Sequence, residues 1–191
     1  MIKELVLKNR SYRRFRGDVP IAVETLKELV DLARHSASAA NLQPLKYVLS
    51  CNREKNALIF SHLSWAAYLQ DWPGPDEGER PSAYIIILGD KGICESFGCD
   101  HGIAAQSIML GAVEKGLGGC MIGSIRRQSL HKALNLPSDY EILLVLAIGK
   151  PMETVVIEPV GPDQDIRYWR DGQGVHHVPK RAMDDIILNN D

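Results

Sequence analysis

Residues 83–89 have the sequence AYIIILG, an uninterrupted apolar run that ends at a glycine. A strand that is apolar on both sides needs cover on both of its faces. The run therefore predicts a strand in a sheet that lies between layers of helices. Residues 45–51, which follow the breaker Gln43-Pro44, and residues 140–148, with an apolar run at 142–148, predict two further strands.

Helices are predicted around these strands. Residues 22–33 carry apolar side chains at every third or fourth position, which indicates an amphipathic helix with one buried stripe. Residues 100–115 are apolar nearly all round, with a thin polar edge at Gln106 and Glu114. Such a helix needs burial nearly all round. In a domain of this size, that burial points to a second subunit. A short helix over residues 2–9 is predicted to end in a basic loop.

The composition is that of an ordinary globular protein. The chain has 191 residues, of which 45% are hydrophobic and 24% are charged, and its formal net charge is −2. This length predicts a single domain, residues 1–191. The charge balance does not support nucleic-acid binding, and no apolar run approaches the roughly 20 residues of a membrane helix. We expect a cytoplasmic protein whose four cysteines are reduced thiols, with no nucleic-acid or membrane partner.

The chain turns polar after Pro151. Short strands are predicted in this part, the last two at 166–170 and 175–178, with a hairpin turn at 171–174 between them. Residues 151–191 have little apolar area of their own. We therefore expect this tail to lie across another surface, such as that of a partner chain.

Residues 10–14, RSYRR, concentrate three guanidinium groups and a hydroxyl at the end of the first helix. Arginine forks and a serine hydroxyl suit a phosphate dianion. The alternative is a solvated charged turn. Lys180 and Arg181 form a second basic pair near the other terminus, which taken alone indicates solvated surface.

Two further segments are suited to a flat ligand. Residues 36–44, SASAANLQP, offer exposed backbone amides and two carboxamides that can bind the edge of a planar heterocycle. Residues 118–124, GGCMIGS, let the backbone approach a ring closely, because glycine has no side chain. The alternative for residues 36–44 is an ordinary helix-to-strand loop, and the alternative for residues 118–124 is a turn that ends a helix. The glycine spacing does not fit a dinucleotide fingerprint.

Other chemistry has little support. Residues 61–81 place three aromatic side chains before a loop rich in proline and glycine, which suits a substrate lid, although core packing is the alternative. These side chains are Trp65, Tyr68 and Trp72. The spacing of Cys94, Cys99 and His101 matches no common zinc site, so no metal is expected. No nucleophile elbow or catalytic triad is present, and no catalytic side chain is predicted.

Together, the segments at 10–15, 36–44, 118–123 and 147–151 resemble the nitroreductase family of flavoproteins. The resemblance implies an α+β fold with a mainly antiparallel central sheet flanked by helices. It also implies a homodimer with two FMN sites at its interface, in which the tail of each subunit embraces the partner. In such a protein the flavin carries the chemistry.

By position, the resemblance assigns phosphate and ribityl contacts to the basic segment and ring contacts to residues 121–123, with the basic pair of the tail closing on the phosphate. The resemblance also implies that three of the loop residues come from the opposite subunit: Ser38, Ala39 and Asn41. The full set of expected cofactor-binding residues is Arg10, Ser11, Arg13, Arg14, Ser38, Ala39, Asn41, Gln43, Met121, Ile122, Gly123, Lys180 and Arg181.

The implied activity is a ping-pong hydride transfer from NADH or NADPH to a small acceptor such as a nitroaromatic or a quinone. The alternative is a flavin-binding or sensing protein with little turnover, in which Trp65 or Trp72 blocks the face of the ring.

Overall fold

The computed structural model of the chain describes residues 1–188 and divides into two compact units. The first unit comprises Met1–Trp65 and Pro73–Met152, and the second comprises Ala66–Trp72 and the residues from Glu153 onward. Each unit is described by itself. No helix within the described residues is both long and apolar enough to cross a membrane.

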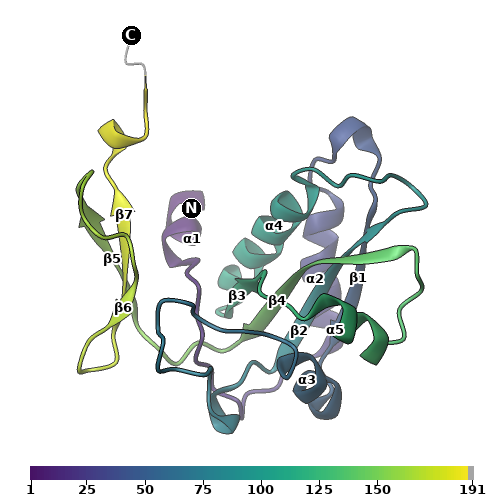
Figure 1. Ribbon diagram of the computed structural model, residues 1–191, viewed down its shortest axis with the longest axis horizontal. Helices are drawn as coiled ribbons and strands as arrows, with labels where there is room; N and C mark the ends of the chain where they lie inside the picture. The colour runs from purple at the N-terminus through teal and green to yellow at the C-terminus, as the bar shows by residue number, and fades with distance from the viewer. Residues whose placement is uncertain (189–191) are drawn as a thin grey trace. The chain divides into compact units, whose positions relative to one another are not determined.

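The first unit is built on a four-stranded antiparallel sheet (Figure 1). Its strands, in spatial order, are β1 (Leu45–Ser50), β2 (Ala83–Asp90), β4 (Tyr140–Gly149) and β3 (Gly118–Ile122). The seven residues from Ala83 to Gly89 are buried, which confirms that the apolar run forms a strand covered on both faces. β2 is therefore central, while β1 and β3 are the two edges.

One face of the sheet packs against α2 (Val23–Arg34) and α4 (Asp100–Glu114). Because side chains alternate along a strand, Ile85 and Ile87 of β2 face these helices, whereas Tyr84 and Ile86 face the other way. That other face is contacted by α3 (Arg53–Phe60). The unit also contains α1 (Ile2–Lys8), α5 (Arg127–Ala133) and the 3₁₀ turns η1 (Ala39–Asn41) and η2 (Glu77–Glu79).

Two local predictions need correction. Residues 53–60, for which no element was predicted, form α3. This helix begins after Asn52, whose side chain accepts a 2.9 Å hydrogen bond from the Lys55 amide. Gly118 and Gly119, offered as a helix-ending turn or a ligand-facing loop, belong to strand β3.

Apolar surface remains open in the single chain. The helix α4 buries one side in the core, but Ile103 is 39% exposed, so the prediction of burial nearly all round is not met within one chain. The helix α1 has no buried residue, and its Ile2 and Leu7 side chains are 66% and 50% exposed.

The second unit contains a three-stranded sheet in the order β5 (Val155–Val160), β7 (His176–Arg181) and β6 (Trp169–Arg170), followed by the 3₁₀ turn η3 (Met183–Asp185). The strands β6 and β7 form the antiparallel hairpin predicted from its turn residues, with Trp169 opposite His177. The parallel pairing of β5 with β7 was not foreseen.

A buried ion pair lies within the second unit. The carboxylate of Glu153 is fully buried and accepts a 2.8 Å bond from Arg170, whose guanidinium also lies over the Trp72 ring at 4.3 Å. The rings of Tyr68 and Tyr168 lie 4.9 Å apart. Residues 66–72 are therefore packed against the tail segment.

His177 is expected to give the second unit a pH-dependent stability. Hydrogen bonds to Glu158 and Asp171, at 2.7 Å and 3.3 Å, raise the pKa of His177 above its ordinary value of 6.5. Because the folded pKa is raised, this contribution to stability is fully present below about pH 6.5 and is lost as pH rises through the folded pKa. An NMR titration should place the midpoint above 6.5. It should fall towards 6.5 in Glu158→Gln, and an unchanged midpoint in that variant would contradict the assignment.

Candidate functional site

The predicted basic segment lies directly against β3. Ser11 forms a bridge with Gly119, and the Tyr12 amide donates a 2.9 Å hydrogen bond to the Gly119 carbonyl. A Cβ on Gly118 would lie 2.5 Å from the Tyr12 ring, so glycine is needed there for this close approach. Segments more than 100 residues apart in sequence thus form one surface.

The three arginines of this segment have different environments. Arg10 donates to the Val6 carbonyl at 2.8 Å through Nη2, while its buried Nε has no hydrogen-bond partner among the described residues. Arg13 is buried and donates to the Ser11 carbonyl at 3.2 Å. Arg14 forms a two-pronged ion pair with Glu79, with Nε to Oε2 at 2.6 Å and a second contact from Nη2 to Oε1. The fork of Arg14 is therefore directed at a carboxylate of its own chain.

The open edge of β3 presents backbone hydrogen-bonding groups. Residues two apart on a strand direct their amide groups to the same edge. Because the Gly119 carbonyl faces Tyr12, away from β4, the Met121 amide is directed to that edge as well. Met121 is 37% exposed, Ile122 is buried, and a Cβ on Gly123 would meet nothing within 4 Å. A flat ligand has room to approach the backbone here.

The second predicted segment forms a strained loop between α2 and β1. Ala40, Asn41 and Gln43 have φ values of +49°, +55° and +53°. For residues other than glycine, this left-handed conformation costs about 1–2 kcal/mol each. Such a loop keeps its shape only when other contacts hold it.

Asp100 supplies those contacts. Its carboxylate, at the first residue of α4, accepts hydrogen bonds from the Ser38 hydroxyl at 2.6 Å and from the Ala39 amide at 3.0 Å. The Ser38 hydroxyl in turn accepts from the Gln43 amide at 2.9 Å. Sequence reasoning missed Asp100, because its partners are about 60 residues away and nothing in the local sequence signals them.

The loop and the basic segment lie at opposite corners of the sheet in one chain. Leu45, where the loop joins β1, pairs with Gly89 of β2, and Gly89 pairs with Glu141 of β4. At the other end of β4, Gly149 pairs with Gly118 of β3. Eight residues of β4 separate these levels, or roughly 26 Å, and three strand spacings of about 4.8 Å separate the edges. The two segments therefore join the sheet at different corners, and both contact the helix α4, where Ser36 bonds Ser107 and Asn9 bonds Gln106.

The remaining predicted residues are distributed between the units. Trp65 is buried in the first unit, and its ring centroid lies 5.7 Å from that of Phe60. This environment is that of the core-packing alternative. Tyr68 and Trp72 belong to the second unit and pack on its tail segment. Lys180 and Arg181 are exposed at the end of β7 in that unit. The lid role of the three aromatic residues stays a prediction.

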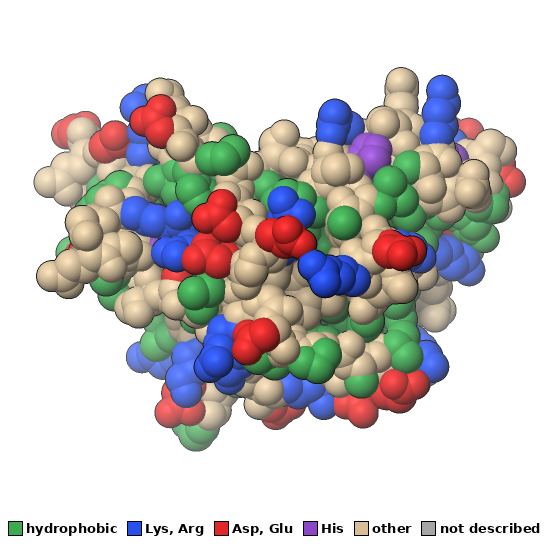
Figure 2. Space-filling model, turned by 90° about the horizontal axis from the view of Figure 1, so that it is seen from below, with side chains coloured by type: hydrophobic (Ala, Val, Ile, Leu, Met, Phe, Trp, Pro, Cys, Tyr) green, Lys and Arg blue, Asp and Glu red, His purple; other side chains and the backbone are tan. Residues whose placement is uncertain are grey.

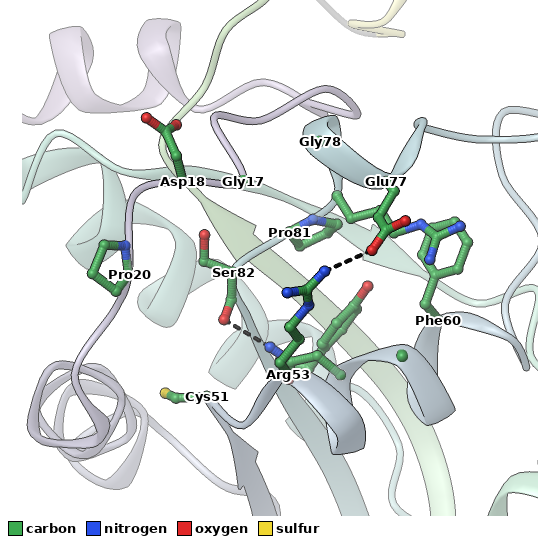
Figure 3. Close-up of a pocket in the computed structure, with 14 residues that line it drawn as sticks. Gly17, Asp18, Pro20, Cys51, Arg53, Phe60, Glu77, Gly78, Pro81 and Ser82 are labelled. Atoms are coloured by element: carbon green, nitrogen blue, oxygen red, sulfur yellow. Dashed lines mark hydrogen bonds and ion pairs between the residues drawn. The ribbon is translucent and has the colours of Figure 1, made fainter.

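A separate cavity of about 710 Å³ lies in the first unit beside α3, on the side of the sheet that Tyr84 faces. Figure 3 shows Arg53 pointing to Glu77 at this cavity, where their side chains form a 2.7 Å ion pair. Burial raises the pKa of the Tyr84 hydroxyl, so this group stays neutral. No expected cofactor-binding residue lines the cavity, so it is distinct from the surface around β3.

Charged side chains of both signs are interspersed over the face seen in Figure 2. Contact with a nucleic-acid backbone relies on clustered Lys and Arg. On this face of the described residues, basic groups instead lie beside acidic ones.

Comparisons with known proteins show the family of the chain and relatives with a similar fold. A model of the nitroreductase family matches residues 6–77 and 89–150. An NADPH-flavin oxidoreductase of Vibrio harveyi is 26% identical over 164 residues, which cover 82% of this chain and 68% of the relative. The putative NAD(P)H nitroreductase YodC of Bacillus subtilis is 25% identical over 179 residues, covering 78% and 89%. An FMN-dependent nitroreductase from Clostridium difficile superposes with a TM-score of 0.68 at 21% identity, covering 100% of this chain and 99% of the other.

Proposed function

The chain belongs to the nitroreductase family, and from this premise we propose that it is an FMN-dependent oxidoreductase. It takes a hydride from NADH or NADPH and passes electrons to a nitroaromatic, a quinone or a similar small acceptor in a ping-pong cycle. The observation that carries this proposal is the pairing of Ser11 with Gly119, because it joins the phosphate-binding residues to the strand edge suited to a flat ring.

The residues at this surface fit FMN. The buried Nε of Arg10, which has no partner in the described chain, and the exposed Ser11 hydroxyl offer donors for a phosphate. Arg13 lies in the same segment, and the open space at Gly123 leaves room for a ring. Arg14 is left out of the proposed site, because its guanidinium is engaged by Glu79. Lys180 and Arg181 remain proposed phosphate contacts from the tail.

We propose a homodimer in which the two halves of each site come from different subunits. The loop that holds Ser38, Ala39 and Asn41 joins β1 at one corner of the sheet and Gly119 lies towards the opposite corner, so a second copy of the chain can bring its loop to the edge of β3. The exposed apolar side chains of α1 and Ile103 of α4 provide surface for that contact. We propose that the tail of each subunit embraces its partner. We also propose a cytoplasmic location, where cysteines stay reduced; the four cysteines of the structure are free thiols.

In this proposal the protein binds and orients while the cofactor reacts. FMN, when bound, accepts a hydride from NAD(P)H and passes electrons on to the acceptor. Arg10 and Ser11 hold the phosphate, which fixes the position of the cofactor relative to β3. The main-chain donor of Met121 is suited to a ring nitrogen, and donors placed where negative charge develops stabilise it. No side chain is assigned a role as acid or base.

The proposal is tested by mixing the FMN-loaded protein anaerobically with NADH and, separately, with NADPH. We expect the visible flavin absorbance to bleach with at least one donor and to return when a quinone or nitroaromatic is added. Bleaching that no acceptor reverses would favour the flavin-sensing alternative. Failure of the protein to bind FMN, or of both donors to bleach it, would contradict the proposed function.

A further inference from the structure

We infer that Asp100 is a positioning residue, which holds the loop of residues 38–43 in the conformation that contacts the cofactor of the partner subunit. This inference rests on the proposed function, and it assigns a role to a residue outside the expected cofactor-binding set. Asp100 itself does not touch the cofactor in this account. It acts through Ser38 and Ala39.

The carboxylate is well placed to act as a fixed anchor. Asp100 is only 4% exposed, and its helix α4 buries Ala104, Ala105 and Ile108 in the core. Asp100 is also the first residue of α4, and the unpaired backbone amides at the N-terminus of a helix stabilise a negative charge. The anchor is thus part of the rigid framework of the first unit.

The hydrogen bonds form a chain from this anchor to the end of the loop. The Ser38 hydroxyl donates its one proton to Asp100 and accepts the Gln43 amide. Hydrogen bonds in series strengthen one another, and those to an ionised group are the strongest. Both ends of the strained segment are therefore tied to one carboxylate.

The other hydrogen bonds of the loop are internal to it, from the Asn41 amide to the Ser38 carbonyl at 2.9 Å and from the Leu42 amide to the Ala39 carbonyl at 3.0 Å, so they do not tie it to the framework. Residues 39–43 are exposed, and a cavity of about 270 Å³ lies beside Ser38, Gln43, Tyr47 and Asp100. Side-chain packing thus gives this segment limited support. The left-handed residues Ala40, Asn41 and Gln43 would relax to commoner conformations without another restraint.

The hydrogen bonds also determine what the loop can offer to a ligand. Since the Ser38 proton is used by Asp100, the hydroxyl can only accept a further bond. The exposed carboxamide of Asn41 supplies donors, whereas the amides of Ala39, Asn41, Leu42 and Gln43 are used within the protein. Their directions depend on the φ values that the Asp100 contacts maintain. Asp100 therefore sets cofactor affinity and has a smaller effect on the stability of the core.

The test compares Asp100→Asn with the wild-type full-length protein. The asparagine keeps the size of the side chain, but its amide nitrogen cannot accept the Ser38 proton and its oxygen is uncharged. We expect faster hydrogen exchange in the peptide covering residues 38–43, and an FMN Kd raised about tenfold or more, measured by flavin fluorescence quenching. Ser38→Ala, which removes the same hydrogen bond from the side of the loop, should shift both measurements in the same direction.

Ser107→Ala is the matched control. This residue is also on α4, and its hydroxyl bonds Ser36 at 2.7 Å, outside the segment of residues 38–43. It should leave FMN Kd and the exchange of residues 38–43 unchanged. Equal losses in this variant, or a Kd in Asp100→Asn equal to that of the wild type, would overturn the positioning role alone. Failure of the wild-type protein to bind FMN would overturn the proposed function, and the positioning role with it.

Discussion

Gly119→Ala is expected to lower the free energy of unfolding by about 3 kcal/mol, at the upper end of the range for overpacked sites. A Cβ at this position would lie 2.2 Å from the carbonyl oxygen of Ala147 and 2.9 Å from Cε of Met109. The methionine end can move, but the carbonyl belongs to the neighbouring strand β4. The clash can therefore be relieved only if β3 and β4 move apart at the Gly119–Ile148 pair.

The loss should be visible in both stability and cofactor binding. For a protein of this length, about 3 kcal/mol corresponds to a thermal midpoint lowered by ~6–12 °C. FMN should be bound less tightly as well, because displacement of β3 also displaces the Tyr12 amide that bonds to Gly119. Thermal unfolding of the FMN-free protein, followed by circular dichroism, measures the first effect separately from the second.

Gly123→Ala provides the control on the same segment. A Cβ there would meet no atom within 4 Å, so the free energy of unfolding should change by less than about 0.5 kcal/mol. FMN affinity should nevertheless fall, since a methyl group would stand where the ring is proposed to approach the backbone. A stable Gly119→Ala protein, or an equally large loss of stability in Gly123→Ala, would contradict this account of β3.

Local patterns predicted most of the elements. The unbroken apolar run at 83–89 made β2 recognisable, because only burial on both faces favours such a sequence in a strand. The hairpin around Asp171 was predictable from its turn residues. In contrast, α3 has no distinct apolar stripe, and the parallel pairing of β5 with β7 depends on a register that neither strand specifies alone.

The candidate site was predictable in part. The chemistry of residues 10–14 and 118–123 indicated a phosphate and a ring, and the structure places Ser11 beside Gly119. Which arginine serves as a free donor was not predictable, because the partner of Arg14 is Glu79, 65 residues away. The hydrogen bond between Ser38 and Asp100 was equally unpredictable, because these residues are 62 positions apart. Contacts between distant residues arise from packing, which local sequence does not encode.

Arg10→Gln is expected to raise the FMN Kd by about 10- to 100-fold, the amount that a charge-assisted hydrogen bond to phosphate contributes. The glutamine keeps a polar side chain but removes the charge and the buried Nε donor that lacks a partner. Within residues 1–188 no ion pair of Arg10 is found, and its guanidinium donates to the Val6 carbonyl at 2.8 Å. Stability of the FMN-free protein should therefore change little.

Riboflavin separates the phosphate contact from every other effect, because it has the same ring and ribityl chain without the phosphate. Its Kd should be equal in the wild type and Arg10→Gln, whereas that of FMN differs. Arg14→Gln should behave in the opposite way: removing the partner of a half-buried Glu79 carboxylate lowers stability, with FMN and riboflavin affected alike. If Arg10→Gln weakens riboflavin as much as FMN, Arg10 shapes the segment and does not bind the phosphate. If only Arg14→Gln discriminates between the two ligands, the assignment of the arginines is reversed.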